Sequence, residues 1–337
     1  MVVKQKHRFG FKRWLVVLLI VVEIFLARYY PPIRPLAELA PETLTQEINL
    51  PIIGHVGFTN TILTVLIADL LLVLAAIIVY RTYKKENAIP RGITSIFEML
   101  VEGLYNLVEN TAGKWARTIF PIMASIFLLV VTVNLMKLLP GMESIGLIHK
   151  TEVAGEGFAV ERVGIFSILK KPAAGEQGEY NIIPFFRPSS TDVNFTLGLA
   201  LVAMTSVQII GLRAGGLGYF QKFLNIKNFL KLWVREKLGP FDILMPFIDI
   251  FVGILELISE FARIISFTFR LFGSMFAGAF LLGIMGSLFL IIQSGFLFLE
   301  LFFGVIQAFV FCMLTMVFMT MATQTHGEHQ EQKEATA

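Results

Sequence analysis

Arg270 is the residue of this chain with the clearest chemical potential, because it is the only charged side chain in the apolar stretch 264–292. A guanidinium group keeps its proton in proteins, so this side chain stays positively charged wherever it lies. At the centre of a bilayer such a charge costs about 2.5–3.5 kcal/mol, and such residues normally face a partner or a water-filled path. None of the side chains one helical turn away can be negatively charged: Ser266, Phe267, Gly273 and Ser274. The partner must therefore come from another helix of the chain or from another subunit.

Two positions with further charges lie along the same helical stripe. Glu256, Arg263 and Arg270 are spaced seven residues apart, close to two helical turns, and Glu260 is one turn from both Glu256 and Arg263. These upstream charges either form a local ion-pair cluster near one end of a helix or line an ion path. The first reading does not account for Arg270.

Small residues follow Arg270 at positions that would allow a second helix to come close: Gly273, Ser274, Ala277 and Gly278. They predict either tight packing inside the chain or a surface past which another helix slides. On the last apolar helix, Glu300, Gly304 and Gln307 share a face. Glu300 is a candidate proton relay or the direct counter-ion of Arg270. Gln307 would donate a hydrogen bond to a charged neighbour or simply connect two helices.

The composition indicates a polytopic membrane protein that is all-α. Of 337 residues 55% are hydrophobic and only 16% are charged, against about 25% charged in soluble domains. The single cysteine, Cys312, is expected to be a small buried apolar residue. The five histidines have no metal-ligand spacing, and there is no phosphate-binding loop, zinc-protease pair or nucleophile elbow. We therefore expect no metal, no cofactor, no nucleotide site and no nucleic acid partner.

About six membrane helices are expected, and the first is residues 14–27. The basic segment before it also fits a signal peptide, but no small-residue cleavage pattern follows, which favours an uncleaved span. The second covers residues 57–80, and Asp69 within it is expected to face protein. Residues 90–114 have apolar positions at helical spacing and predict an amphipathic helix at the membrane surface. Residues 119–139 predict the next span.

The polar segment 141–190 is expected to be a long extramembrane loop, followed by a span over 193–212 and a basic connector. The mostly apolar block 241–292 is too long for one ordinary span, since a continuous helix would reach roughly 75 Å against a hydrocarbon core of about 30 Å. It is either two spans joined by a tight turn or one long, strongly tilted helix, and the lack of a dividing proline favours the latter. A break is expected at 293–295 and a final helix over 296–321.

The distribution of Lys and Arg predicts the orientation. With six spans, both termini share a side with the connectors 81–117 and 213–240, which hold most of the basic residues. By the positive-inside rule that side is the cytoplasm. The expected location is the plasma (inner) membrane of a bacterium.

Four motifs in order resemble subunit a of F-type ATP synthases. The run from Arg270 to Gly278, RLFGSMFAG, resembles the family signature, with Glu256 fourteen residues before it. The segments 307–311 (QAFVF), 188–194 (PSSTDVN) and 134–140 (NLMKLLP) are similar to three further family motifs. The resemblance divides the chain into three parts: a basic N-terminus with an extra membrane helix and outer segment (1–56), the subunit a membrane domain (57–325) and a polar tail (326–337).

The resemblance implies a non-catalytic stator in a rotary motor. A long tilted helical hairpin would pack against a ring of c subunits, with Arg270 facing the ring carboxylate between two half-channels. Peripheral-stalk b subunits and the rest of the ATP synthase would be its other partners. The resemblance implies translocation of protons, which are a more common choice than sodium ions, by Arg270, Glu300, Gln307, Glu256 and Ser274. Candidates for lining the half-channels are Asp192, Asn194, Asp69, Glu260 and Arg263.

The chain departs from the family pattern at two positions. Ser274 stands where many members have Asn, and Ala279 stands where many have an acid. Glu300 occupies the position of the last helix where the family has His or an acid. We therefore expect Glu300 to perform the relay alone. Two other functions are an independent secondary transporter, for which no internal repeat is found, and a non-conducting assembly protein, which would not explain Arg270.

Overall fold

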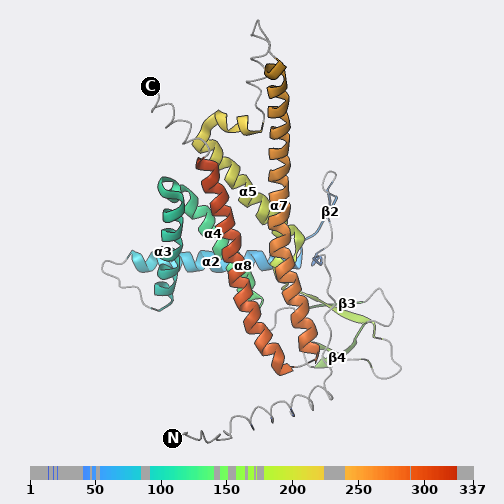
Figure 1. Ribbon diagram of the computed structural model, residues 1–337. Coiled ribbons are helices and arrows are strands. Elements are labelled where there is room, and N and C mark those ends of the chain that lie inside the picture. The colour runs from blue at the N-terminus through green and yellow to red at the C-terminus, as the bar shows by residue number, and fades with distance from the viewer. Residues whose placement is uncertain are drawn as a thin grey trace, which may run out of the picture.

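The computed structural model describes most of the chain outside its ends. The described residues are 14, 18, 21, 41–45, 48–50, 54–84, 92–139, 145–150, 157–163, 166–170, 172, 178–223, 240–288 and 290–324. The expected first span at 14–27 therefore lies outside the described residues, except for three exposed positions, and so does the polar tail. Within the described part the protein is predominantly helical (Figure 1).

The described residues form six long helices: α2 (Asn60–Tyr83), α3 (Ile93–Ala112), α4 (Ala116–Met136), α5 (Val193–Gly215), α7 (Pro240–Leu288) and α8 (Leu290–Gln324). Four described segments are long and apolar enough to cross a membrane: Asn60–Tyr83, Thr94–Met136, Val193–Gly215 and Gly295–Gln324. The second of these joins α3 to α4 through the short 3-10 helix η1 (Gly113–Trp115). The predicted spans 57–80, 119–139 and 193–212 thus correspond to α2, α4 and α5.

The long block is one helix. α7 runs unbroken from Pro240 to Leu288, over 49 residues, which at 1.5 Å per residue is about 74 Å. The reading of a single long helix is therefore confirmed, and the two-span reading is wrong. The expected break at 293–295 is also wrong, because α8 already begins at Leu290. Serine and glycine are only mildly unfavourable inside a helix, about 1 kcal/mol for glycine, so this cluster was a weak stop signal.

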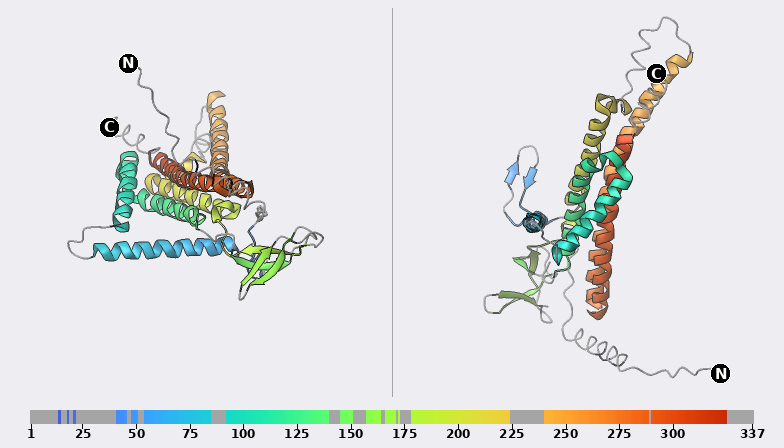
Figure 2. Two further views of the ribbon diagram at one scale, coloured as in Figure 1. Left: turned by 90° about the horizontal axis from the view of Figure 1, so that it is seen from below. Right: turned by 90° about the vertical axis from the view of Figure 1, so that its left-hand side faces the viewer.

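The core lies among α4, α5, α7 and α8, which pack along one another (Figure 2). Phe267 of α7 meets Phe311 of α8 edge to face, with ring centroids 4.9 Å apart. Both rings are buried, together with apolar residues of α4 and α5 such as Met123 and Ile210. Burying aromatic and aliphatic side chains contributes roughly 1.5–3 kcal/mol each. This packing fixes α7 against α8 at the level of Arg270.

Helix α2 runs across the other helices rather than along them. In the right-hand view of Figure 2 it is seen end-on, while α4, α5, α7 and α8 are seen from the side. If α2 follows the membrane normal, the helical hairpin of α7 and α8 is strongly tilted. Asp69 of α2 is exposed, so the expectation that it faces protein is wrong for the chain alone. The described part of the chain contacts α2 on one face only. Ala68 lies on that face and is buried, whereas its neighbour Asp69 does not lie on it.

The segment 141–190, which was expected to be a loop, has more regular structure among its described residues than predicted. It contains two small antiparallel sheets, β3 (Gly146–Lys150) with β6 (Tyr180–Pro184), and β4 (Ala159–Val163) with β5 (Phe166–Lys170). A third pair, β1 (Ile48–Leu50) with β2 (Gly54–Val56), precedes α2. These strands are short and paired two by two, and such pairs give little periodic signal in sequence.

Candidate functional site

The backbone around Arg270 is fixed by polar side chains, whereas its guanidinium group is not. Gln307 of α8 donates from Nε2 to the carbonyl oxygen of Arg270 at 3.1 Å, and the hydroxyl of Ser274 donates to the same oxygen at 3.0 Å. Gln307 thus connects the two helices, as one of its two readings proposed. The Arg270 side chain is exposed, and no ion pair within the described ranges involves it. The chain therefore offers a permanent positive charge at its surface.

Glu300 does not serve as the counter-ion of Arg270. Its carboxylate lies against Gly278, where an added Cβ would approach Oε1 to 2.8 Å. Gly278 is eight residues, or about 12 Å of helix, beyond Arg270. Instead, Glu300 forms an ion pair with Lys137 of α4, and both side chains are buried. The alternative of a direct Arg270–Glu300 pair is wrong in this structure.

Lys137 and Asn134 belong to the family-like segment 134–140, but the sequence analysis gave neither residue a role. Asn134 donates from Nδ2 to the carbonyl oxygen of Gly304 at 2.9 Å, one turn from Glu300 on α8. An added Cβ on Gly304 would come within 3.1 Å of the Asn134 Cβ, so glycine lets α4 and α8 approach here. The signal was available, because Lys137 is a charge at the end of an apolar run and deserved the scrutiny given to Arg270.

Two of the upstream charges, Glu260 and Arg263, form the local ion pair that one reading predicted, but at the middle of α7 rather than near one end. Arg263 donates from Nη1 to Glu260 Oε1 at 2.8 Å and lies over the Phe318 ring of α8, 4.9 Å from its centroid. Glu256, one turn before Glu260, is half-buried. This cluster faces η3 (Gly216–Lys222), where burial, aided by the charge of Glu260, raises the pKa of Tyr219 to about 12. The phenol is therefore neutral and donates to Gln208 Oε1 at 2.9 Å.

Asp192 belongs to a separate buried polar site at the start of α5. Its Oδ1 accepts from the backbone N–H of Asn194 at 2.9 Å, which caps the helix, and its Oδ2 accepts from the Thr61 hydroxyl of α2 at 2.9 Å. The short helix η2 (Ser189–Thr191) adds a bond from Ser189 Oγ to the carbonyl oxygen of Thr61. Asp192 is 3% exposed, so the carboxylate connects α2 and α5.

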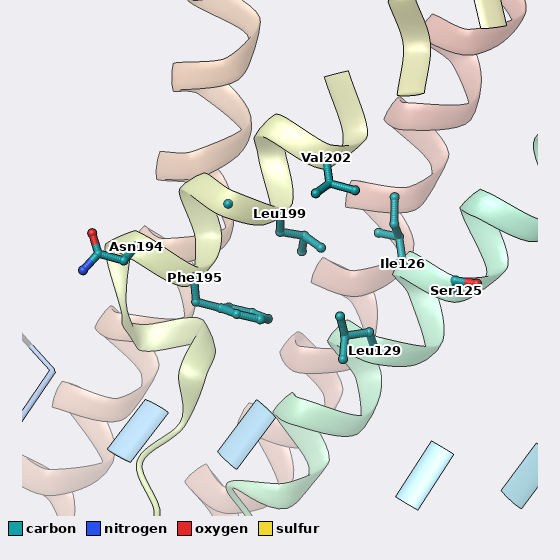
Figure 3. A pocket seen from close by; sticks show the side chains of 8 residues that line it. Ser125, Ile126, Leu129, Asn194, Phe195, Leu199 and Val202 are labelled. Carbon is teal, nitrogen blue, oxygen red and sulfur yellow. The ribbon is translucent and has the colours of Figure 1, made fainter. Parts of the chain in front are cut away.

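Asn194 borders an open, largely apolar groove of about 400 Å³ between α4 and α5. Phe195 and Leu199 of α5 extend toward Ile126 and Leu129 of α4 across this groove (Figure 3).

The residues predicted to form the site lie in several distinct places. Arg270, Ser274 and Gln307 are together, Glu256, Glu260 and Arg263 form a cluster, and Glu300, Asp192 with Asn194, and Asp69 each lie apart from these. No group of three or more His, Cys, Asp or Glu side chains suited to a metal ion occurs among the residues described.

A comparison of the sequence with models of protein families shows which family the chain belongs to. The family model described as "ATP synthase A chain" matches residues 62–320, which is most of the chain. The chain belongs to this family. The match begins in α2 and ends in α8, so it covers Arg270, Glu300, Lys137 and Asp192 alike.

Individual relatives agree with the family assignment. ATP synthase subunit a of Teredinibacter turnerae is 30% identical over 71% of this chain and 70% of its own length. Subunit a of Sulfurihydrogenibium sp. is 27% identical over 79% of this chain and 98% of its own length. A protein of Propionigenium modestum named "ATP synthase subunit a, sodium ion specific" is 27% identical over 79% of this chain and 75% of its own length.

Family membership settles the class of this ATP synthase A chain. It is a membrane-sector subunit of an F-type ATP synthase and contributes ion translocation rather than nucleotide chemistry. An independent secondary transporter finds no support. The family assignment drawn from four short motifs is thereby confirmed over residues 62–320.

Proposed function

We propose that this chain conducts protons to and from a ring of c subunits, with Arg270 facing a ring carboxylate near the middle of the membrane. The observation that carries the proposal is the exposed guanidinium of Arg270, which has no ion-pair partner among the described residues of its own chain. A charge held at bilayer depth needs such a partner. Gln307 and Ser274 support it by fixing the backbone from which the side chain projects.

In this mechanism Arg270 stabilises the ionised ring carboxylate that faces it and separates two aqueous half-channels. A ring carboxylate picks up a proton on one side of Arg270 and releases it on the other, so net proton flow requires rotation. Each charge moved down the membrane potential supplies about 2.3 kcal/mol per 100 mV. Glu300 is the proposed relay on one side, since Ala279 offers no acid there.

The remaining polar residues are proposed to line access paths to these half-channels. Glu256, Glu260 and Arg263 are clustered near the middle of α7, and Asp192 and Asn194 lie at the start of α5. Asp69 is exposed on α2 and would be reached from outside the chain. The proposed ion is the proton, which a carboxyl group such as Glu300 can carry.

The proposed setting is the plasma membrane of a bacterium, with both termini in the cytoplasm. The basic residues of the connectors 81–117 and 213–240 support this orientation. Peripheral-stalk b subunits are the proposed partners that keep the chain from turning with the ring.

Cysteine cross-linking in the whole complex tests the contact with the ring. Ser274 is exposed beside Arg270, and the single native cysteine, Cys312, is buried, so Ser274→Cys introduces one accessible thiol on α7. Together with a cysteine near the ring carboxylate, mild oxidation is expected to yield a disulfide-linked a–c product on a gel. A disulfide requires Cα atoms within about 7 Å.

The matched control is Leu70→Cys, an exposed position on α2, which packs on α4. It is expected to give no product with the same ring cysteine. A missing product with Ser274→Cys, or an equal yield from both positions, would mean that the Arg270 surface does not face the ring.

A further inference from the structure

The ion pair between Lys137 and Glu300 is buried at a junction of three helices. Lys137 is the capping residue after α4, Glu300 is on α8, and the Lys137 ammonium also donates to the carbonyl oxygen of Met275 on α7 at 3.3 Å. The two side chains are 6% and 7% exposed. A buried pair of this kind is often no more stable than apolar residues of the same volume, so stability alone does not explain it.

The pair occupies only one of the two carboxylate oxygens. Lys137 binds Oε1, whereas Oε2 of Glu300 is buried and has no hydrogen-bond partner in the part of the chain that the structure describes. One turn away along the same pair of helices, Asn134 donates through its Nδ2 to Gly304, but its Oδ1 is a second buried acceptor without a partner among those residues. Buried acceptors of this kind are normally satisfied by water.

We propose that Lys137 is a positioning residue of the proton path, which supplies the counter-charge of Glu300 and leaves Oε2 open to exchange a proton. The inference rests on the proposed relay role of Glu300. In the relay, Oε2 takes a proton from a hydronium ion of the half-channel, which leaves water, and the carboxyl group then releases this proton toward the ring carboxylate. The Lys137 ammonium balances the charge of the carboxylate whenever the carboxylate is ionised.

The geometry explains why a cation is suited to this place. Gly278 on one side and the ammonium on the other hold the Glu300 carboxylate between α7 and α4. Without the counter-charge, a buried carboxyl group holds its proton instead of passing it on. Without the contact, it also loses its orientation, and a displacement of about 1 Å in a proton-transfer geometry can lower a rate roughly a hundredfold.

The test measures passive proton conductance per assembled complex, in vesicles from which the peripheral catalytic sector has been stripped. Lys137→Gln keeps a hydrogen-bond donor but removes the charge, and Lys137→Met removes both. Each is expected to lower conductance per complex by roughly a hundredfold, with normal amounts of subunits a and c in the membrane. Lys137→Arg keeps the charge and is expected to retain most of the conductance.

Two outcomes would overturn the proposal. Unchanged conductance per complex in Lys137→Gln would show that the charge is not needed. Because the neutral variants leave a carboxyl that can take up a proton, both should assemble. Loss of the complex in both would assign the pair to assembly. Glu300→Gln, measured in parallel, separates the two claims: if it conducts normally, the relay itself is wrong, and if only the Lys137 variants conduct normally, only this inference fails.

Discussion

Replacing Arg270 by alanine is expected to abolish coupled ATP synthesis while leaving the complex assembled. A ring carboxylate that passes this point in ionised form would lose its counter-charge, and an uncompensated charge at the centre of the bilayer costs about 2.5–3.5 kcal/mol. Each 1.36 kcal/mol added to a barrier lowers a rate about tenfold. ATP synthesis driven by a proton gradient in membrane vesicles should therefore fall by at least roughly a hundredfold. Assembly should be unaffected, because Gln307 binds the carbonyl oxygen of Arg270, which alanine retains.

Arg81→Ala is the matched control for this experiment. Arg81 lies in the last turn of α2 and is also exposed. Its replacement by alanine therefore removes one exposed arginine and leaves α7 unchanged. The rate of ATP synthesis should stay near that of the protein without substitutions. Arg270→Ala membranes that still synthesise ATP at more than a few per cent of the normal rate would refute the assigned role.

Replacing Glu300 by glutamine is expected to give the second large effect. The amide has nearly the same shape but cannot carry a proton, and loss of a positioned proton-transfer group typically lowers rates by about 10²–10⁴-fold. Passive proton conductance per complex should fall into this range, since Ala279 provides no substitute acid. The measurement is the rate of pH change in vesicles loaded with a fluorescent pH indicator.

A loss of assembly must be distinguished from a loss of conductance here. Glu300→Gln leaves the Lys137 ammonium buried without its counter-ion, which is strongly destabilising. The double variant Glu300→Gln with Lys137→Gln removes both charges and should assemble, yet it should conduct as poorly as the single variant. Glu300→Asp keeps an acid and should recover part of the flux. Normal conductance in the double variant would place the relay elsewhere.

The sequence predicted the local features of this site but not which of its side chains pair across helices. The length of α7 and the isolation of Arg270 follow from hydropathy and spacing, which are local properties. The partner of Glu300 lies 163 positions away in the chain. Local sequence patterns do not indicate which distant helices will pack against each other. Both alternatives offered for Glu300 therefore omitted Lys137.

Errors in the predicted elements have similarly physical origins. The cluster 293–295 resembled a turn, yet α7 extends to Leu288 and α8 already begins at Leu290, before that cluster. Asp69 was expected to face protein because a charge in a span usually does, but α2 packs on its neighbours through Asn60, Thr61, Thr64 and Ala68 and leaves Asp69 exposed.

The position of the Arg270 side chain within the assembled membrane sector is the most direct test of the account. A cryo-electron microscopy map of the chain bound to its ring should place the guanidinium group opposite a ring carboxylate, with Lys137 rather than Arg270 on Glu300. A map in which Arg270 is turned away from the ring and closed in an ion pair with an acid of its own chain would contradict it.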